Sequence, residues 1–141
     1  MVPREDLLKV AKELDYLVVL IPLDKDTRNI IGADLLATMK PTAFVINMAR
    51  GGVVDEPALM KALEAGQIAG AALDVYAKEP LPPDSPLWKT KNLTCFPHQG
   101  GYSEGYEDRA MPTIDTNMRK YFAGDLKTML NIVKRPASWG G

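Results

Sequence analysis

Several residue types and patterns that mark common protein classes are scarce in this sequence. Its 141 residues include one Cys and one His, which excludes an internal disulfide framework and leaves too few soft ligands for a metal site. The longest uninterrupted apolar run extends from Tyr16 to Ile21, far below the ~20 residues of a membrane span. Lys and Arg total 17 against 18 Asp and Glu. The chain therefore lacks the strongly basic surface by which proteins bind nucleic acids or anionic membranes.

The overall composition is that of a globular protein. Hydrophobic residues make up 46% of the chain and charged residues 25%, which argues against disorder. The length suits a single domain over residues 1–141. The first residues, Met1–Asp6, contain no hydrophobic signal core, so we expect a cytoplasmic protein.

Helical and strand patterns alternate along the chain. Helices are predicted at Arg4–Leu14, at Asp34–Lys40, from Asp55 to a stop at Gly66, and at Ser103–Phe122 with a kink or break at Pro112. Strands are predicted at Tyr16–Ile21, Ala43–Met48, Ile68–Val75 and Leu93–Phe96. The alternation predicts an α/β fold with about four parallel strands and flanking helices. A continuous apolar run such as Tyr16–Ile21 is typical of a strand covered on both faces.

Three residues whose side chains can bind a substrate or transfer a proton follow three successive predicted strands. Ligands of open parallel sheets bind at the carboxyl ends of the strands. Arg50 could bind a carboxylate through two parallel hydrogen bonds. His98 could transfer a proton near neutral pH, and Glu79 could orient the imidazole. Each residue alone is explained better as an ordinary surface or loop residue than as a functional one. Their joint placement favours a site for a small 2-oxo or 2-hydroxy acid.

Two other patterns are explained more simply by structure than by function. Cys95 lies three residues before His98, but an odd offset in a strand places two side chains on opposite faces, which opposes a Cys–His hydrolase. Inside an apolar strand, Cys95 is expected to behave as a small hydrophobe. The acidic residues Glu104, Glu107 and Asp108 lie near a helix start, where they complement the helix dipole.

Five segments of the chain carry a family resemblance. They are Val45–Asp55, Gly70–Val75 running on to Glu79-Pro80, Pro97-His98 followed by Gly100-Gly101, Leu20–Leu23 with Thr27, and Phe122–Gly124 with Asn131–Val133. In this order and spacing they resemble the D-isomer-specific 2-hydroxyacid dehydrogenases, over essentially the whole chain.

The resemblance implies hydride transfer between NAD or NADP and a 2-oxo or 2-hydroxy acid. Arg50 would bind the substrate carboxylate and polarise its carbonyl, His98 would donate the proton, and Glu79 would hold His98. Asp74 would contact the nicotinamide end of the cofactor. The residues implied to bind the cofactor are Pro22, Thr27, Ala49, Arg50, Asp74, His98 and Gly100; no metal is implied.

The family's phosphate-binding fingerprint, G-x-G-x-x-G, is missing from the sequence. No two of the eleven glycines are separated by a single residue. The turn and helix N-terminus that hold the pyrophosphate are therefore not encoded here. We expect the chain to be a truncated form, the C-terminal half of a dinucleotide-binding (Rossmann) domain without the substrate domain. NAD or NADP binding by this chain alone should be weak.

Two hypotheses remain for such a chain. It is either a 2-hydroxyacid dehydrogenase of reduced activity, or a non-catalytic fragment or assembly module descended from one. In the doubly wound order Tyr16–Ile21 would lose its neighbouring strand, and an apolar edge invites pairing with another chain. We therefore expect a homo-oligomer built through this edge, or a complex with a separately encoded N-terminal half.

Overall fold

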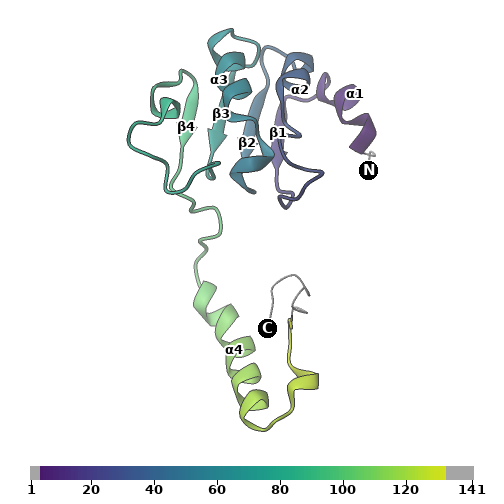
Figure 1. Cartoon of the computed structure of the whole chain (residues 1–141), viewed down its shortest axis with the longest axis vertical. Coiled ribbons are helices and arrows are strands. Elements are labelled where there is room, and N and C mark those ends of the chain that lie inside the picture. The colour runs from purple at the N-terminus through teal and green to yellow at the C-terminus, as the bar shows by residue number, and fades with distance from the viewer. Residues whose placement is uncertain (1–3, 133–141) are drawn as a thin grey trace. The chain divides into compact units, whose positions relative to one another are not determined.

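The structure is a computed structural model that describes residues 4–132 of the chain. It divides into two compact units, Met1–Gly101 and Tyr102–Gly141 (Figure 1). The N-terminal unit holds a four-stranded sheet, and the C-terminal unit holds a long helix. Val133, the last residue of the family-like tail, lies outside the described residues.

The sheet of the N-terminal unit is parallel throughout. Its strands are β1 (Tyr16–Val19), β2 (Phe44–Asn47), β3 (Gly70–Leu73) and β4 (Leu93–Cys95), in the spatial order β1-β2-β3-β4. Val18 is in register with Ile46, and Ile46 with Ala72. The predicted α/β class and the four parallel strands are confirmed, and β1 is an edge strand of the sheet.

The helices begin and end near the predicted positions. The α-helices are α1 (Leu7–Ala11), α2 (Ala33–Thr38), α3 (Glu56–Glu64) and α4 (Tyr106–Phe122); short 3-10 helices occupy Arg4–Asp6, Gly51–Val53, Pro86–Lys89 and Leu126–Thr128. The Asp55 side chain caps α3 by accepting the N–H of Ala58 at 3.0 Å. Gly66 follows α3 with a left-handed φ of 66°, which a glycine adopts without strain.

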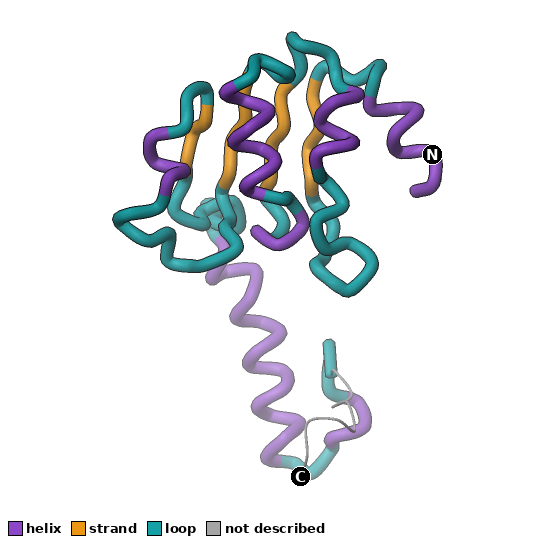
Figure 2. Tube along the Cα trace, turned by 45° about the horizontal axis from the view of Figure 1, so that its top comes forward, coloured by secondary structure: helices purple, strands orange, loops and turns teal. Residues whose placement is uncertain are grey.

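The hydrophobic core lies between the helices of the N-terminal unit and one face of its sheet. Leu36 of α2 and Leu59 of α3 are fully buried, as are Val45 of β2 and Leu73 of β3. Figure 2 shows α2 and α3 over the same side of the strands. Since side chains alternate across a strand, every second strand residue faces this core.

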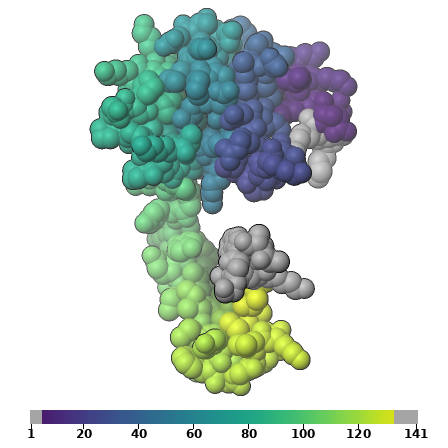
Figure 3. All heavy atoms as spheres, in the orientation of Figure 1, coloured from purple at the N-terminus to yellow at the C-terminus, as the bar shows by residue number. Residues whose placement is uncertain are grey.

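The opposite face of the sheet is apolar and open. Tyr16 is 64% exposed, Val18 50% and Phe44 39%, and the Tyr16 and Phe44 rings stack with their centroids 5.7 Å apart. The expectation that Tyr16–Ile21 is covered on both faces is therefore wrong. The helices that pack on this sheet lie on one side of it, and the space-filling view shows the N-terminal unit as one closely packed body (Figure 3).

The long helix α4 runs through Pro112 without interruption, so no break occurs at this residue, and the alternative of a kink stays a prediction. A proline removes one backbone hydrogen bond of a helix, and here the helix continues on both sides of it. Within the C-terminal unit, the Asn117 side chain bonds the backbone N–H and carbonyl of Leu130 at 2.7 and 2.9 Å. No helix within residues 4–132 has both the length and the apolar character needed to cross a membrane.

Candidate active site

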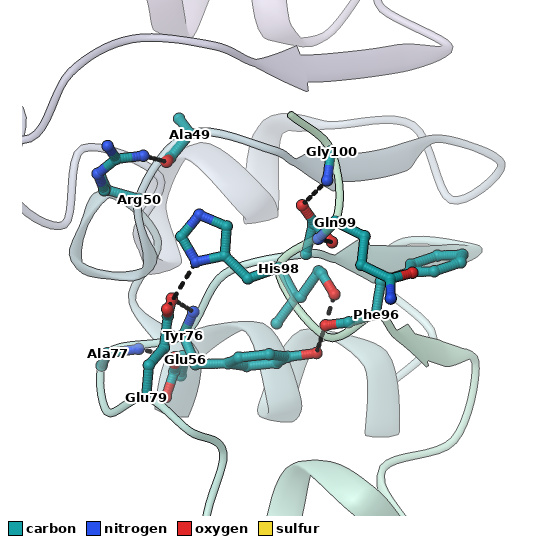
Figure 4. A network of polar contacts seen from close by, with 12 residues as sticks. Ala49, Arg50, Glu56, Tyr76, Ala77, Glu79, Phe96, His98, Gln99 and Gly100 are labelled. Carbon is teal, nitrogen blue, oxygen red and sulfur yellow. Dashed lines mark hydrogen bonds and ion pairs between the residues drawn. The ribbon is translucent and has the colours of Figure 1, made fainter. Parts of the chain in front are cut away.

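Three loops at the carboxyl end of the sheet carry the predicted site residues. Arg50 follows β2, the segment 74–79 follows β3, and His98 follows β4. Because the three strands are adjacent and parallel, the loops that follow them meet at one edge of the sheet. Figure 4 shows the polar contacts of these loops, in which His98 is joined to Glu79 and Arg50 is joined to Ala49.

The His98 imidazole and the Glu79 carboxylate are in direct contact. Nδ1 of His98 lies 2.7 Å from Oε2 of Glu79. The other carboxylate oxygen, Oε1, accepts the backbone N–H of Tyr76 at 2.9 Å. Within residues 4–132, Nε2 of His98 has no hydrogen-bond partner, and it points away from Glu79 (Figure 4). Glu79 thus fixes the ring through one nitrogen and leaves the other available to a ligand.

The backbone of the His98 loop is held by Asp74, which is 5% exposed. The two oxygens of its carboxylate accept the N–H groups of Gln99 at 2.7 Å and Gly100 at 2.6 Å. His98 itself has a φ of +56°, a left-handed conformation that few non-glycine residues adopt. Such strain persists only where surrounding contacts impose it, and the two bonds to Asp74 directly after His98 supply that constraint.

Arg50 is exposed at the start of the short helix Gly51–Val53. Its Nη1 donates to the carbonyl of Ala49 at 2.7 Å, and within residues 4–132 it forms no ion pair. Its backbone is fixed by Asn47, whose amide nitrogen donates to the Arg50 carbonyl and whose amide oxygen accepts the Ala49 N–H, both at 3.1 Å. The remaining guanidinium N–H groups are therefore free to bind a carboxylate.

The charges around Glu79 favour its ionised form. Partial burial raises its pKa, but the hydrogen bonds from Tyr76 and His98 and the positive charges of His98 and Arg50 outweigh this effect. The net result is a Glu79 pKa below its ordinary value of 4.5. The positive charges of His98 and Arg50 both act on Glu79, although only His98 is in contact with it. Burial also raises the pKa of the Tyr76 hydroxyl, which donates to the carbonyls of Leu73 and Phe96.

The lowered Glu79 pKa predicts a specific acid dependence of stability. A carboxyl whose pKa is lower in the folded than in the unfolded state stabilises the fold above its unfolded pKa. This contribution is lost as the pH falls below 4.5 and through the folded pKa. We expect Glu79→Gln to be less stable than the wild type at neutral pH and to lose less stability on acidification. Urea unfolding at a series of pH values measures this, and parallel pH profiles of the two proteins would contradict it.

Five of the seven residues that the resemblance assigns to the cofactor border two hollows, and His98 and Thr27 border neither. One hollow of about 290 Å³ is lined by Ile46, Met48, Ala72, Asp74, Phe96, Gln99 and Gly100. The other, of about 580 Å³, is lined by Leu20, Ile21, Pro22, Leu23, Met48, Ala49 and Arg50. Thr27 is buried, and its hydroxyl is used within its own loop, 2.8 Å from the Pro22 carbonyl oxygen and 2.7 Å from the Asp24 nitrogen. Its role toward a cofactor stays a prediction.

Four residues that shape the site were not singled out from the sequence. Asn47 fixes Arg50, Tyr76 orients Glu79, Gly51 allows two loops to touch, and Glu56 bonds the Ala77 N–H at 2.6 Å. One signal was available for Asn47, because a polar residue inside an apolar strand must find hydrogen-bond partners when buried. The others act through backbone contacts that no residue pattern indicates.

The structure favours the simpler interpretation of Cys95. Its side chain packs against the core beside Tyr76, and the ring nitrogen of His98 that has a partner contacts Glu79. Among the described residues, no group of three or more His, Cys, Asp or Glu is placed to hold a metal ion.

Sequence comparison decides the ancestry of this site. Residues 1–100 match the family described as D-isomer specific 2-hydroxyacid dehydrogenase, NAD binding domain. The chain belongs to this family. The resemblance of the strand-end segments is thereby confirmed, although the role of each site residue remains to be tested.

Individual relatives extend well beyond this chain. It is 45% identical over 123 residues to the glyoxylate/hydroxypyruvate reductase B of Pectobacterium carotovorum, covering 86% of this chain and 38% of that protein. It is 39% identical over 132 residues to a D-3-phosphoglycerate dehydrogenase of Methanocaldococcus jannaschii, covering 94% and 25%. A crystal structure of a D-isomer specific 2-hydroxyacid dehydrogenase from Xanthobacter autotrophicus superposes with a TM-score of 0.79 at 41% identity, covering 92% of this chain and 42% of that one. The chain thus spans about two fifths or less of these relatives.

Proposed function

We propose that the chain carries the catalytic residues of an NAD(P)-dependent 2-hydroxyacid dehydrogenase and corresponds to the C-terminal half of its dinucleotide-binding domain. The observation that carries the proposal is the contact of His98 with Glu79 at the same sheet edge as Arg50. Arg50 binds the carboxylate of a small 2-oxo acid. His98 donates a proton from Nε2 to the carbonyl oxygen, and Glu79 orients the ring.

The hollow beside Asp74 fits the nicotinamide end of a cofactor. Its walls are mostly apolar side chains, which suit a flat ring, and a buried carboxylate lies at one side. A related Xanthobacter structure was solved in complex with NADPH and MES. The bound cofactor would supply the hydride. In this chain Asp74 and Gly100 would border the ring, while Pro22, Ala49 and Arg50 line the adjoining hollow.

A second candidate is a non-catalytic module. It applies to a chain of these residues alone, since they contain no G-x-G-x-x-G fingerprint, whose backbone amides bind the pyrophosphate of a dinucleotide. The open apolar sheet face favours it, because such faces serve association. In this case the Arg50, Glu79 and His98 set would be retained from an enzyme ancestor without turnover.

NADH titration and a reductase assay separate the two candidates. We expect weak binding of NADH by the chain alone, because only contacts at the nicotinamide end are available. Reduction of 2-oxo acids, with glyoxylate and hydroxypyruvate among the substrates offered, is then followed by NADH absorbance at high cofactor concentration. His98→Asn should lower any rate by roughly 10²–10⁴-fold, the range for loss of a general acid. Asn also tolerates the left-handed backbone at this position.

The outcomes bear on the two candidates in different ways. Reduction that depends on His98 supports the enzyme, and reduction unchanged in His98→Asn contradicts the proposed roles. Complete absence of reduction under saturating substrate supports the module. Tight NADH binding would contradict the expectation that the missing fingerprint limits affinity.

We further propose that a second copy of this chain pairs with it through the edge strand β1. The outer backbone groups of an edge strand are available for pairing, and β1 is an edge of the sheet. The exposed Tyr16, Val18 and Leu20 next to this edge form an apolar surface, which an aqueous monomer rarely leaves uncovered. A symmetric pair would extend the sheet across this edge and bring the two apolar surfaces side by side.

Light scattering of wild-type and variant chains tests this pairing. We expect a dimer or larger oligomer for the wild type, and a shift toward monomer in Val18→Lys, because lysine on an edge strand opposes association. Gln67→Lys adds the same charge at an exposed position after α3 and should not change the mass. A monomeric wild type at micromolar concentration would contradict the pairing and leave a separately encoded N-terminal half as the partner to seek.

A further inference from the structure

We propose that Glu56 is a positioning residue that ties the turn carrying Glu79 to the loop carrying Arg50. The inference rests on the proposed function, in which Glu79 orients His98. Glu56 is the first residue of α3 and lies outside the set implied by the family resemblance. Its side chain contacts neither Arg50 nor His98, so it would act through the backbone of the turn at residues 76–79.

The turn donates two successive backbone N–H groups to two different carboxylates. The Tyr76 N–H bonds Oε1 of Glu79 at 2.9 Å, and the Ala77 N–H bonds Oε1 of Glu56 at 2.6 Å (Figure 4). The direction of the Tyr76 N–H depends on the orientation of this turn, which the Ala77–Glu56 bond holds from the neighbouring peptide. Glu56 therefore fixes the donor that in turn fixes Glu79.

Gly51 packs closely against the same turn. A Cβ placed on Gly51 would lie 1.8 Å from the carbonyl carbon of Tyr76 and 2.3 Å from the nitrogen of Ala77, so the two backbones are in close contact. Gly51 directly follows Arg50, and Glu56 lies five positions further along the same segment. The segment that carries Arg50 thus contacts the turn that carries Glu79 through both Gly51 and Glu56. These two contacts set the position of the Glu79 carboxylate relative to the Arg50 guanidinium.

Helix capping does not account for the Glu56 side chain. The first turn of α3 already has its cap in Asp55, which accepts the Ala58 N–H at 3.0 Å. An acid in the first helical turn gains stability from the helix dipole wherever its side chain points. Here the carboxylate instead reaches 21 positions along the chain to Ala77. A charge-assisted bond to a backbone N–H is among the stronger hydrogen bonds in proteins.

The pKa of Glu79, measured in Glu56 variants, tests this role, because the two explanations predict shifts of that pKa in opposite directions. Removal of a nearby negative charge alone would lower the pKa of Glu79, because like charges disfavour ionisation. Release of the turn would weaken the Tyr76 bond and raise that pKa toward its ordinary value of 4.5. We expect Glu56→Ala to raise the Glu79 midpoint, measured by carboxyl ¹³C NMR. Glu56→Gln, which loses the charge but keeps an acceptor oxygen, should not raise it.

Amide exchange gives a second measurement on the same proteins. Exchange at Ala77 should be about tenfold faster in Glu56→Ala than in Glu56→Gln, the effect of losing one hydrogen bond to a good acceptor. Glu64→Ala removes an exposed charge at the other end of α3 and should change neither quantity. A Glu79 midpoint that falls or stays unchanged in Glu56→Ala would overturn the proposal. Neither measurement requires turnover, so an inactive chain would contradict the proposed function while leaving this test intact.

Discussion

Gly51→Ala should be the most destabilising Gly→Ala substitution in the N-terminal unit. The added Cβ would lie 1.8 Å from the Tyr76 carbonyl carbon, 2.1 Å from its oxygen and 2.3 Å from the Ala77 nitrogen. All three are backbone atoms, so no side-chain rotation relieves the overlap. We expect a loss of about 3 kcal/mol or more in the free energy of unfolding, the upper range for overpacking. Domains of this size are stabilised by only about 5–15 kcal/mol.

Gly101→Ala provides the matched control for this experiment. A Cβ at Gly101 would meet no atom within 4 Å, so the same chemical change should leave the urea midpoint nearly unchanged. If Gly51→Ala unfolds at the same urea concentration as Gly101→Ala, the close approach of the Arg50 loop to the Glu79 turn is refuted. A large difference supports the arrangement on which the site depends.

The second large effect is expected for Asp74→Ala. This buried carboxylate accepts the N–H groups of Gln99 and Gly100, and hydrogen bonds to charged groups are the more stabilising kind. Its removal leaves two donors unpaired beside the left-handed His98. We expect the free energy of unfolding to fall by about 3 kcal/mol, together with faster amide exchange at Gln99 and Gly100.

Asp115→Ala serves as the comparison for Asp74→Ala. Asp115 forms an exposed pair with Arg119 on α4 at 2.8 Å, and exposed pairs contribute little to stability. The truncation of this carboxylate should therefore leave the urea midpoint close to that of the wild type. Equal effects of the two substitutions would show that Asp74 does not hold the His98 loop in solution.

The sequence predicted the strand ends and hence the residues that gather there. Short apolar runs bounded by proline and glycine located four strands, and their parallel order placed Arg50, Glu79 and His98 on one edge. The expected contact between His98 and Glu79 forms, but the left-handed backbone of His98, with a φ of +56°, was beyond such reasoning. That conformation is imposed by Asp74 from another loop, and residue patterns do not encode contacts of this kind.

Periodicity also failed where the surroundings of an element decide its burial. Tyr16–Ile21 is apolar on both faces, yet Val19 is 4% exposed and Val18 50%. The apolar run is compatible with a strand buried on both faces. The helices that pack on this sheet cover only one of these faces. Pro112 is the converse case, since its local preference against helix is outweighed by the helical residues on both sides.

The protonation of the His98 ring tests the central arrangement most directly. If the Glu79 carboxylate accepts a hydrogen bond from Nδ1–H of His98, the neutral imidazole carries its proton on Nδ1 and its Nε2 is unprotonated. Long-range ¹H–¹⁵N NMR distinguishes the two tautomers at a pH where the ring is neutral. We predict the Nδ1–H form in the wild type and its loss in Glu79→Ala. A wild-type ring protonated on Nε2, unchanged by removal of the Glu79 carboxylate, would contradict the site.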